Sequence, residues 1–68
     1  MSKNQMMNNK LREIRLKRGL TQKQVAELLG LQCEDRLSHW ENGHAMPGIK
    51  NLFRLAKIYK VGPENLYI

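Results

Sequence analysis

Glycine residues and turn pairs divide this chain into short segments, each with the periodicity of an α-helix. Gly19 and Gly30 follow runs of apolar residues with helical spacing, where a left-handed residue commonly ends a helix. An Asn-Gly pair at 42–43 and a Gly-Pro pair at 62–63 are strong turn signals. No segment alternates apolar and polar residues as a half-buried strand does. The sequence therefore predicts an all-α domain of five short helices.

The apolar positions between these breaks predict where each helix lies. The five helices are expected at about residues 11–18, 22–29, 33–42, 49–60 and 63–67. Thr21 is a good N-cap for the second helix, and Pro63 suits the first position of the fifth. Their expected apolar faces include Leu11, Ile14, Val25, Leu28, Leu29, Leu37, Trp40, Ile49, Leu52, Phe53, Ala56 and Tyr59.

The charge of the chain favours an anionic partner. Twelve Lys and Arg residues against six Asp and Glu give a net charge of +6, which is typical of proteins that bind nucleic acid. Residues 1–20 carry +5, residues 21–47 carry −2 and residues 48–68 carry +3. A polyanion should therefore be held mainly by the two flanks. Residues 1–8 are polar and Met-rich, with no periodicity, and are predicted to form a flexible arm ahead of one domain over residues 9–68.

Several classes of function are not expected. The chain has no run of 18 apolar residues to span a membrane, and Cys33 has no second cysteine to pair with. Cys33, His39 and His44 are too few for a structural zinc site. No paired carboxylates, activated nucleophile or phosphate-binding loop can be assembled, so we expect no enzyme activity, no cofactor and no small-molecule substrate. These features predict a cytoplasmic protein.

Residues 19–66 resemble the helix-turn-helix of phage Cro and repressor proteins, the XRE family. The most specific matches are the sequence GLTQ at 19–22, the sequence WENG at 40–43 and the pair LA at 55–56. The resemblance implies a compact, lambda-repressor-like domain that binds specific sequences of double-stranded DNA as a transcriptional regulator, usually a repressor. The third helix would enter the major groove, and the second, at about 22–29, would cross the backbone.

The resemblance also implies roles for individual residues. It implies contacts with DNA phosphates for Gln22, Asn42 and Gly43, and the basic residues Lys23 and Arg12 are further candidates on the ground of their charge. Gln22 and Asn42 would donate from their amide side chains, and Gly43 from its backbone. For the basic candidates, a merely solvated surface is the alternative. Arg15 of the first helix and Glu41 of the third would form a structural ion pair.

The third helix supplies the candidates for reading bases. Side chains that face away from Leu37 on a helical wheel, or flank that face, give the candidates Glu34, Asp35, Arg36, Ser38 and His39. Arg36 could contact a guanine, and Asp35 could accept from a cytosine amino group. Acidic residues in a first turn are also favoured by the helix dipole, so a purely stabilising role is the alternative for Glu34 and Asp35.

The sequence departs from the family pattern in the turn. The interval from Gly30 to Trp40 is one residue longer than usual, which places an insertion in the turn or at the start of the third helix. Three or four residues are expected between the second and third helices. Cys33 is expected to fill a small space in the core. Lys60 stands where the family commonly has Gly.

Two further questions concern partners. Tyr59, Tyr67 and Ile68 belong either to the core or to a self-complementary patch, and a homodimer would bind a pseudo-palindromic operator. The alternative function is an antitoxin-like or adaptor module that keeps the fold and uses its acidic third helix against another protein. Peripheral membrane binding is disfavoured because Arg15 and Arg18 interrupt the apolar face of the first helix.

Overall fold

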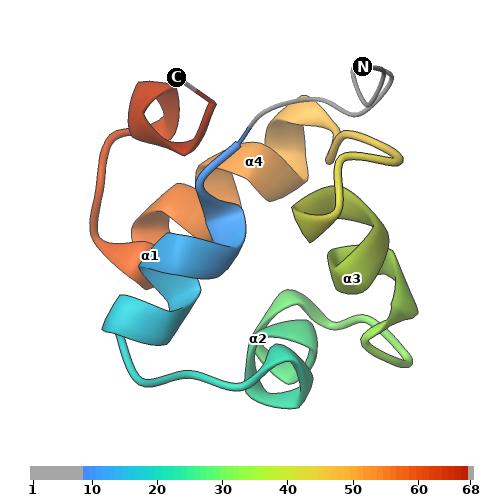
Figure 1. Cartoon of the computed structure of the whole chain (residues 1–68). Coiled ribbons are helices and arrows are strands. Elements are labelled where there is room, and N and C mark those ends of the chain that lie inside the picture. The colour runs from blue at the N-terminus through green and yellow to red at the C-terminus, as the bar shows by residue number, and fades with distance from the viewer. Residues whose placement is uncertain (1–8, 68) are drawn as a thin grey trace.

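The computed structural model describes residues 9–67, and all regular structure in this range is helical (Figure 1). The elements are α1 (Leu11–Lys17), α2 (Gln22–Leu29), α3 (Asp35–Glu41), α4 (Ile49–Tyr59) and the 3₁₀ turn η2 (Pro63–Leu66). The all-α prediction is confirmed, but the prediction of a fifth α-helix is wrong. None of the described helices has the length and apolar character needed to cross a bilayer. The predicted arm over residues 1–8 lies outside the described residues.

The last element is a 3₁₀ turn because its backbone groups are used differently from those of an α-helix. The N–H of Asn65 donates to the carbonyl of Gly62, three residues earlier, at 2.9 Å. The carbonyl of Leu66 accepts from the N–H of Lys10, also at 2.9 Å. This second bond ties the C-terminal turn to the start of α1.

All four α-helices end in the same way. In each, a residue with positive φ is followed by one whose N–H donates to the carbonyl five residues earlier. The four left-handed residues are Gly19, Gly30, Gly43 and Lys60. Glycine adopts this conformation without a steric penalty, as expected for the first three ends. Lys60, at φ 59°, is the one left-handed residue with a side chain among those described.

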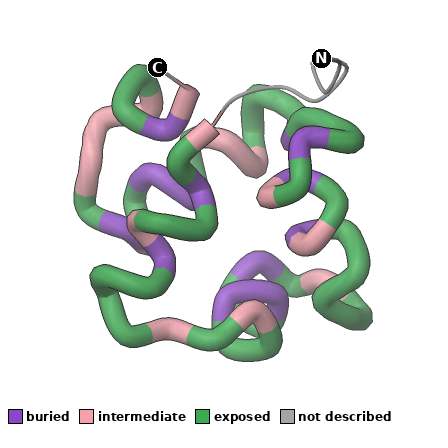
Figure 2. Tube along the Cα trace, viewed as in Figure 1, coloured by how far each residue is buried: buried purple, intermediate pink, exposed green. Residues whose placement is uncertain are grey.

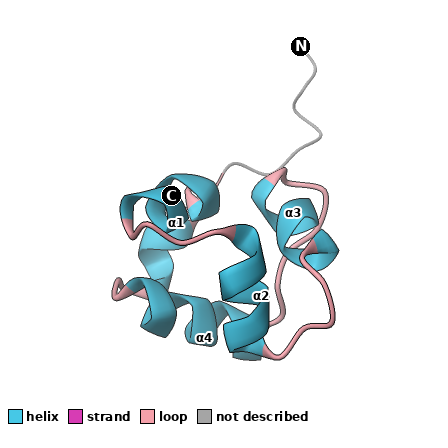
Figure 3. Cartoon of the chain, turned by 90° about the horizontal axis from the view of Figure 1, so that it is seen from below, coloured by secondary structure: helices cyan, strands magenta, loops and turns pink. Residues whose placement is uncertain are grey.

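The helices surround one apolar core (Figure 2). α2 packs against α4, and both α1 and α2 contact α3 (Figure 3). Figure 1 shows α1 between η2 on one side and α3 on the other. The core cluster comprises Leu11, Val25, Leu29, Leu37, Trp40, Leu55, Ala56, Tyr59 and Leu66. Leu37 and Trp40 therefore anchor α3 to the rest of the domain.

Three residues predicted for the apolar faces lie on the surface instead. Leu28 is 57% exposed, Ile49 74% and Phe53 57%. Phe53 lies about 120° from Tyr59 around the axis of α4, too far to share its buried stripe. Ile49 is the first residue of α4, ahead of the part that packs. Hydrophobic spacing alone predicted a wider buried face than the neighbouring helices can cover.

Tyr59 and Tyr67 pack with the core. Tyr59 is fully buried, and Tyr67 is half-buried and packs against the core cluster. Within residues 9–67 neither hydroxyl has a hydrogen-bond partner. Burial raises the pKa of both phenols above the ordinary value of 10.0. Of the two interpretations, the core assignment is confirmed for Tyr59, and Ile68 lies outside the described residues.

Candidate nucleic-acid interface

The helix-turn-helix consists of α2, a turn over residues 30–34 and α3. Thr21 caps α2 in both directions: its hydroxyl accepts from the N–H of Gln24 at 3.0 Å, and its own N–H donates to the Gln24 side chain at 2.9 Å. α3 begins at Asp35 rather than at the predicted Cys33. The turn is therefore five residues long, and the prediction of three or four is wrong.

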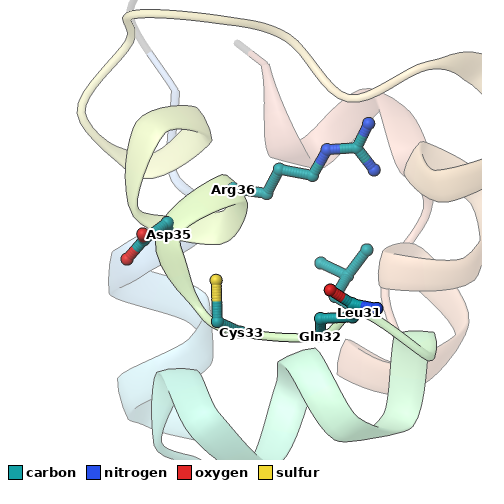
Figure 4. Close-up of a pocket in the computed structure, with 5 residues that line it drawn as sticks. All are labelled: Leu31, Gln32, Cys33, Asp35 and Arg36. Carbon is teal, nitrogen blue, oxygen red and sulfur yellow. The ribbon is translucent and has the colours of Figure 1, made fainter.

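The additional residues of the longer turn are exposed to solvent. Leu31 is half-buried, and its N–H donates to the carbonyl of Ala26 at 2.9 Å, which fixes the first half of the turn. Gln32, Cys33 and Glu34 are exposed. The prediction that Cys33 fills the core is wrong, because the turn bulges before α3 begins. A cavity of about 270 Å³ opens beside the turn, lined by Leu31, Gln32, Cys33, Asp35 and Arg36 (Figure 4).

The outer face of α3 is polar, as the helical wheel predicts. Asp35, Arg36 and His39 are exposed, and Ser38 is half-buried. Asp35 and Arg36 point to opposite sides of the helix start (Figure 4). Glu34 occupies the N-cap position, but its side chain makes no capping hydrogen bond. Both carboxylates are thus presented to solvent at the start of the helix.

Beneath this face lies the ion pair that the resemblance implies. Arg15 Nε donates to Glu41 Oε2 at 2.6 Å, and Arg15 Nη2 donates to Glu41 Oε1 at 3.2 Å. The two side chains are only 7% and 2% exposed. The hydrogen bond to Glu41 is the main cause that raises the pKa of the Arg15 guanidinium above its ordinary value. Arg15 Nη1 also donates to the carbonyl of Leu20 at 2.9 Å, so α1, its end and α3 are joined.

Gln22 belongs to the same network. Its Nε2 donates to Glu41 Oε1 at 2.9 Å, so one carboxylate receives donors from both α1 and α2. This contact uses one of the two N–H bonds of the amide and leaves the other for a further acceptor. Neither spacing nor the resemblance indicated that Gln22 would contact Glu41.

Of the two phosphate contacts predicted at the end of α3, Asn42 is accessible and Gly43 is not. Asn42 is exposed, with its Nδ2 3.4 Å from Ser38 Oγ. Gly43 is buried, and its N–H donates to the carbonyl of Trp40 at 3.1 Å. That N–H is not available to a phosphate in this conformation. The His44 ring meets the His39 ring edge-on, with centroids 6.1 Å apart, and adds a second imidazole to this surface.

The remaining predicted contacts, Arg12 and Lys23, are exposed. Lys23 lies in the first turn of α2 beside Gln22, whereas Arg12 lies on α1, outside the helix-turn-helix unit. Within residues 9–67, no group of three or more His, Cys, Asp or Glu side chains is placed to hold a metal ion.

Sequence reasoning missed the role of Asn9. Its Nδ2 donates to the carbonyl of Trp40 at 3.0 Å, and its Oδ1 accepts from the N–H of Leu11 at 3.0 Å. One side chain thus holds the first turn of α1 and the last turn of α3 together. An Asn two residues before the first helical residue was the available signal, because this residue type often bonds to nearby backbone groups.

Comparisons with known proteins agree with this geometry. The sequence profile of the helix-turn-helix family matches residues 11–66. A protein of Archaeoglobus fulgidus described as an uncharacterized HTH-type transcriptional regulator is 29% identical over 62 residues, covering 91% of this chain and 87% of that protein. The crystal structure of a proposed DNA-binding protein from Bacteroides fragilis is similar with a TM-score of 0.79 and 26% identity, covering 90% of this chain and 97% of that one.

Proposed function

Because the chain belongs to the helix-turn-helix family, we propose that it binds specific sequences of double-stranded DNA and regulates transcription. α3 enters the major groove in this proposal, and α2 crosses the phosphate backbone. Both similar proteins carry descriptions of this kind. The observation that carries the proposal is the polar outer face of α3, which is held rigidly by the network of Arg15, Glu41 and Gln22 beneath it.

The exposed side chains of α3 can recognise base edges. Arg36 can donate two hydrogen bonds to a guanine, and His39 and Ser38 can donate or accept. Leu37 and Trp40 are buried on the opposite side, so the helix cannot rotate to present a different set. Rigid support of this kind reduces the entropy lost on binding.

Amide side chains at two ends of the unit suit contacts with phosphates. Gln22 lies at the start of α2, and Asn42 follows the end of α3. Amide groups and helix N-termini donate to phosphate oxygens and fix the register of the protein on the duplex. Lys23 and Arg12 would add charge to this contact. In a homodimer, two such units would bind half-sites about 34 Å apart in a pseudo-palindromic operator.

Salt dependence tests the proposal directly. Duplexes selected from a random pool would be titrated by fluorescence anisotropy at several salt concentrations. Four to six phosphate contacts per dimer predict a slope of about −4 to −5 in a log–log plot, since each contact contributes about −0.9. Gln22→Ala and Asn42→Ala should weaken binding to all duplexes alike, because phosphate contacts position the protein and do not read sequence. A slope near zero would contradict DNA binding.

One observation favours a second candidate, an antitoxin-like or adaptor module. Glu34 and Asp35 are exposed at the start of α3, and the side chain of Glu34 makes no capping hydrogen bond. Carboxylates there repel phosphates and could instead meet a basic partner protein. Failure to select any duplex from the random pool would favour this candidate.

A further inference from the structure

A second cavity lies on the side of α1 that faces away from α3. It has a volume of about 280 Å³ and lies between α1 and the segment that follows α4. Lys10, Ile14, Lys17 and Arg18 line it from α1 and its flanks, and Val61 lines it from the C-terminal segment. Figure 1 shows α1 between η2 and α3, so this cavity is separate from the proposed DNA-binding face.

Two hydrogen bonds join the opposite sides of this open cavity, one near each end. The N–H of Lys10 donates to the carbonyl of Leu66 at 2.9 Å, and Arg18 Nε donates to the carbonyl of Tyr59 at 2.6 Å. Lys10 and Arg18 are eight residues apart, and in a helix the backbone advances about 12 Å over that interval. The two segments that form the cavity are therefore already joined in the folded protein before any ligand binds.

The cavity is lined by basic side chains around its opening and by apolar side chains at its base. Lys10, Lys17 and Arg18 contribute three positive charges, and Glu13, 3.8 Å from Lys17, contributes one negative charge. Ile14 and Val61 are half-buried and supply apolar surface. The bond to Tyr59 fixes the guanidinium of Arg18 through Nε and leaves its terminal N–H groups, which suit an oxyanion.

From this arrangement we propose that the cavity binds a small organic anion, with its oxyanion group at Arg18 and its apolar body on Ile14 and Val61, while Lys10 and Lys17 add positive charge to the walls. The volume is near the lower end for ligand pockets, which limits the ligand to a small molecule. This inference goes beyond the proposed DNA binding and does not depend on it.

Hexanoate, hexyl phosphate, inorganic phosphate and neutral hexanamide serve as probes, added to the full chain without DNA at constant ionic strength. Amide chemical shifts in ¹⁵N-resolved NMR spectra report where each probe binds. Hexanoate or hexyl phosphate should shift the amides of residues 10–18 and 61–65 in a saturable way, and comparison of the two identifies the preferred oxyanion. Inorganic phosphate and hexanamide should bind more weakly, because each lacks half of the required chemistry. Equal effects of inorganic phosphate and both organic anions would overturn the proposal.

Two charge-matched variants locate the site. Lys10→Gln keeps the backbone bond to Leu66 and should weaken binding about two- to fivefold, because it removes one of the three positive charges that line the cavity. Lys57→Gln removes the same charge from the exposed surface of α4, away from the cavity, and should leave binding unchanged. Arg18→Gln should weaken binding further, with an unchanged amide spectrum outside the cavity as the check on its fold. Equal affinities for Lys10→Gln and Lys57→Gln, or shifts centred on α3, would overturn the proposal.

Discussion

The carboxylate of Glu41 accepts a hydrogen bond of 2.6 Å from the guanidinium of Arg15, 26 residues earlier in the chain. Both side chains are almost fully buried, so the two charges have lost their hydration. The stability of the pair therefore depends on the geometry of its own hydrogen bonds. The same carboxylate accepts from Gln22 at 2.9 Å. One acidic side chain therefore links α3 to both α1 and α2, in addition to the core packing of Leu37 and Trp40.

Replacing Glu41 with Ala should destabilise the domain severely. The change leaves the Arg15 charge buried without its partner, which costs about 3–5 kcal/mol and is comparable to the whole stability of a small domain. Thermal and urea unfolding followed by circular dichroism measure the loss. The paired change Arg15→Met with Glu41→Leu removes both charges and should recover much of the stability. If the Glu41→Ala protein had the same melting temperature as wild type, the ion pair would contribute little to the free energy of unfolding.

Alkaline pH should destabilise the domain through Tyr59. Burial raises the pKa of this phenol in the folded state, so above pH 10 the unfolded chain releases a proton that the folded chain keeps. Below pH 10 both states hold the proton and this contribution is constant. As pH rises further, stability should fall by about 1.4 kcal/mol per pH unit from this one group, within the range where it stays protonated when folded.

Urea unfolding of the Tyr59→Phe variant isolates this contribution from the titrating lysines. The variant should lose stability less steeply than wild type above pH 10. It should be no less stable at pH 7, since the hydroxyl has no partner among the described residues. Tyr67→Phe should give a smaller effect because Tyr67 is only half-buried. Identical slopes for wild type and Tyr59→Phe would mean that Tyr59 ionises freely in the folded protein.

Lys60→Gly should stabilise the protein. Lys60 has φ 59° at the end of α4, and a left-handed residue with a Cβ costs about 1–2 kcal/mol relative to glycine in the same conformation. The larger entropy of glycine in the unfolded chain offsets part of this, which leaves a gain of up to about 1 kcal/mol, or a melting temperature about 4–8 °C higher. Lys57→Gly, inside α4, is the control and should have the opposite sign. A loss of stability in Lys60→Gly would mean that the lysine side chain itself stabilises the cap.

The acidic start of α3 separates DNA reading from simple helix stabilisation. If Asp35 faces the groove, Asp35→Asn should bind non-specific duplex more tightly. It should also discriminate its preferred site less, by about 1–3 kcal/mol at one base pair. If Asp35 only complements the helix dipole, the variant should melt slightly lower and rank DNA sequences as wild type does. Anisotropy with matched and mismatched duplexes, together with a thermal melt, distinguishes the two outcomes.

The elements that sequence predicted well are those set by local chemistry. Thr21 caps α2 and Gly30 ends it because both effects depend on a few neighbouring backbone groups. The Arg15–Glu41 pair joins distant residues, and only the family resemblance indicated it. The failures concern tertiary packing: Phe53 has helical spacing but is not covered by a neighbour among residues 9–67, and Cys33 lies in a turn whose length no local pattern fixed.

The sequence predicted which side chains lie on the outer face of α3, but not which hydrogen-bond donors remain free to contact DNA. The outward side chains of α3 follow from the helical wheel, since Leu37 and Trp40 define its buried side. The engagement of the Gly43 N–H by Trp40, and of Gln22 by Glu41, depends on the exact course of the loop and on contacts between helices. Such contacts leave no periodic trace in the sequence.

The hydrogen bond from Lys10 to Leu66 has a consequence for how the domain opens. Helix ends ordinarily fray independently, each at its own low free energy. Here the first turn of α1 and the terminal turn η2 share a bond, so loosening either one exposes the other. The two ends of the domain should therefore exchange their amide protons with solvent as one unit.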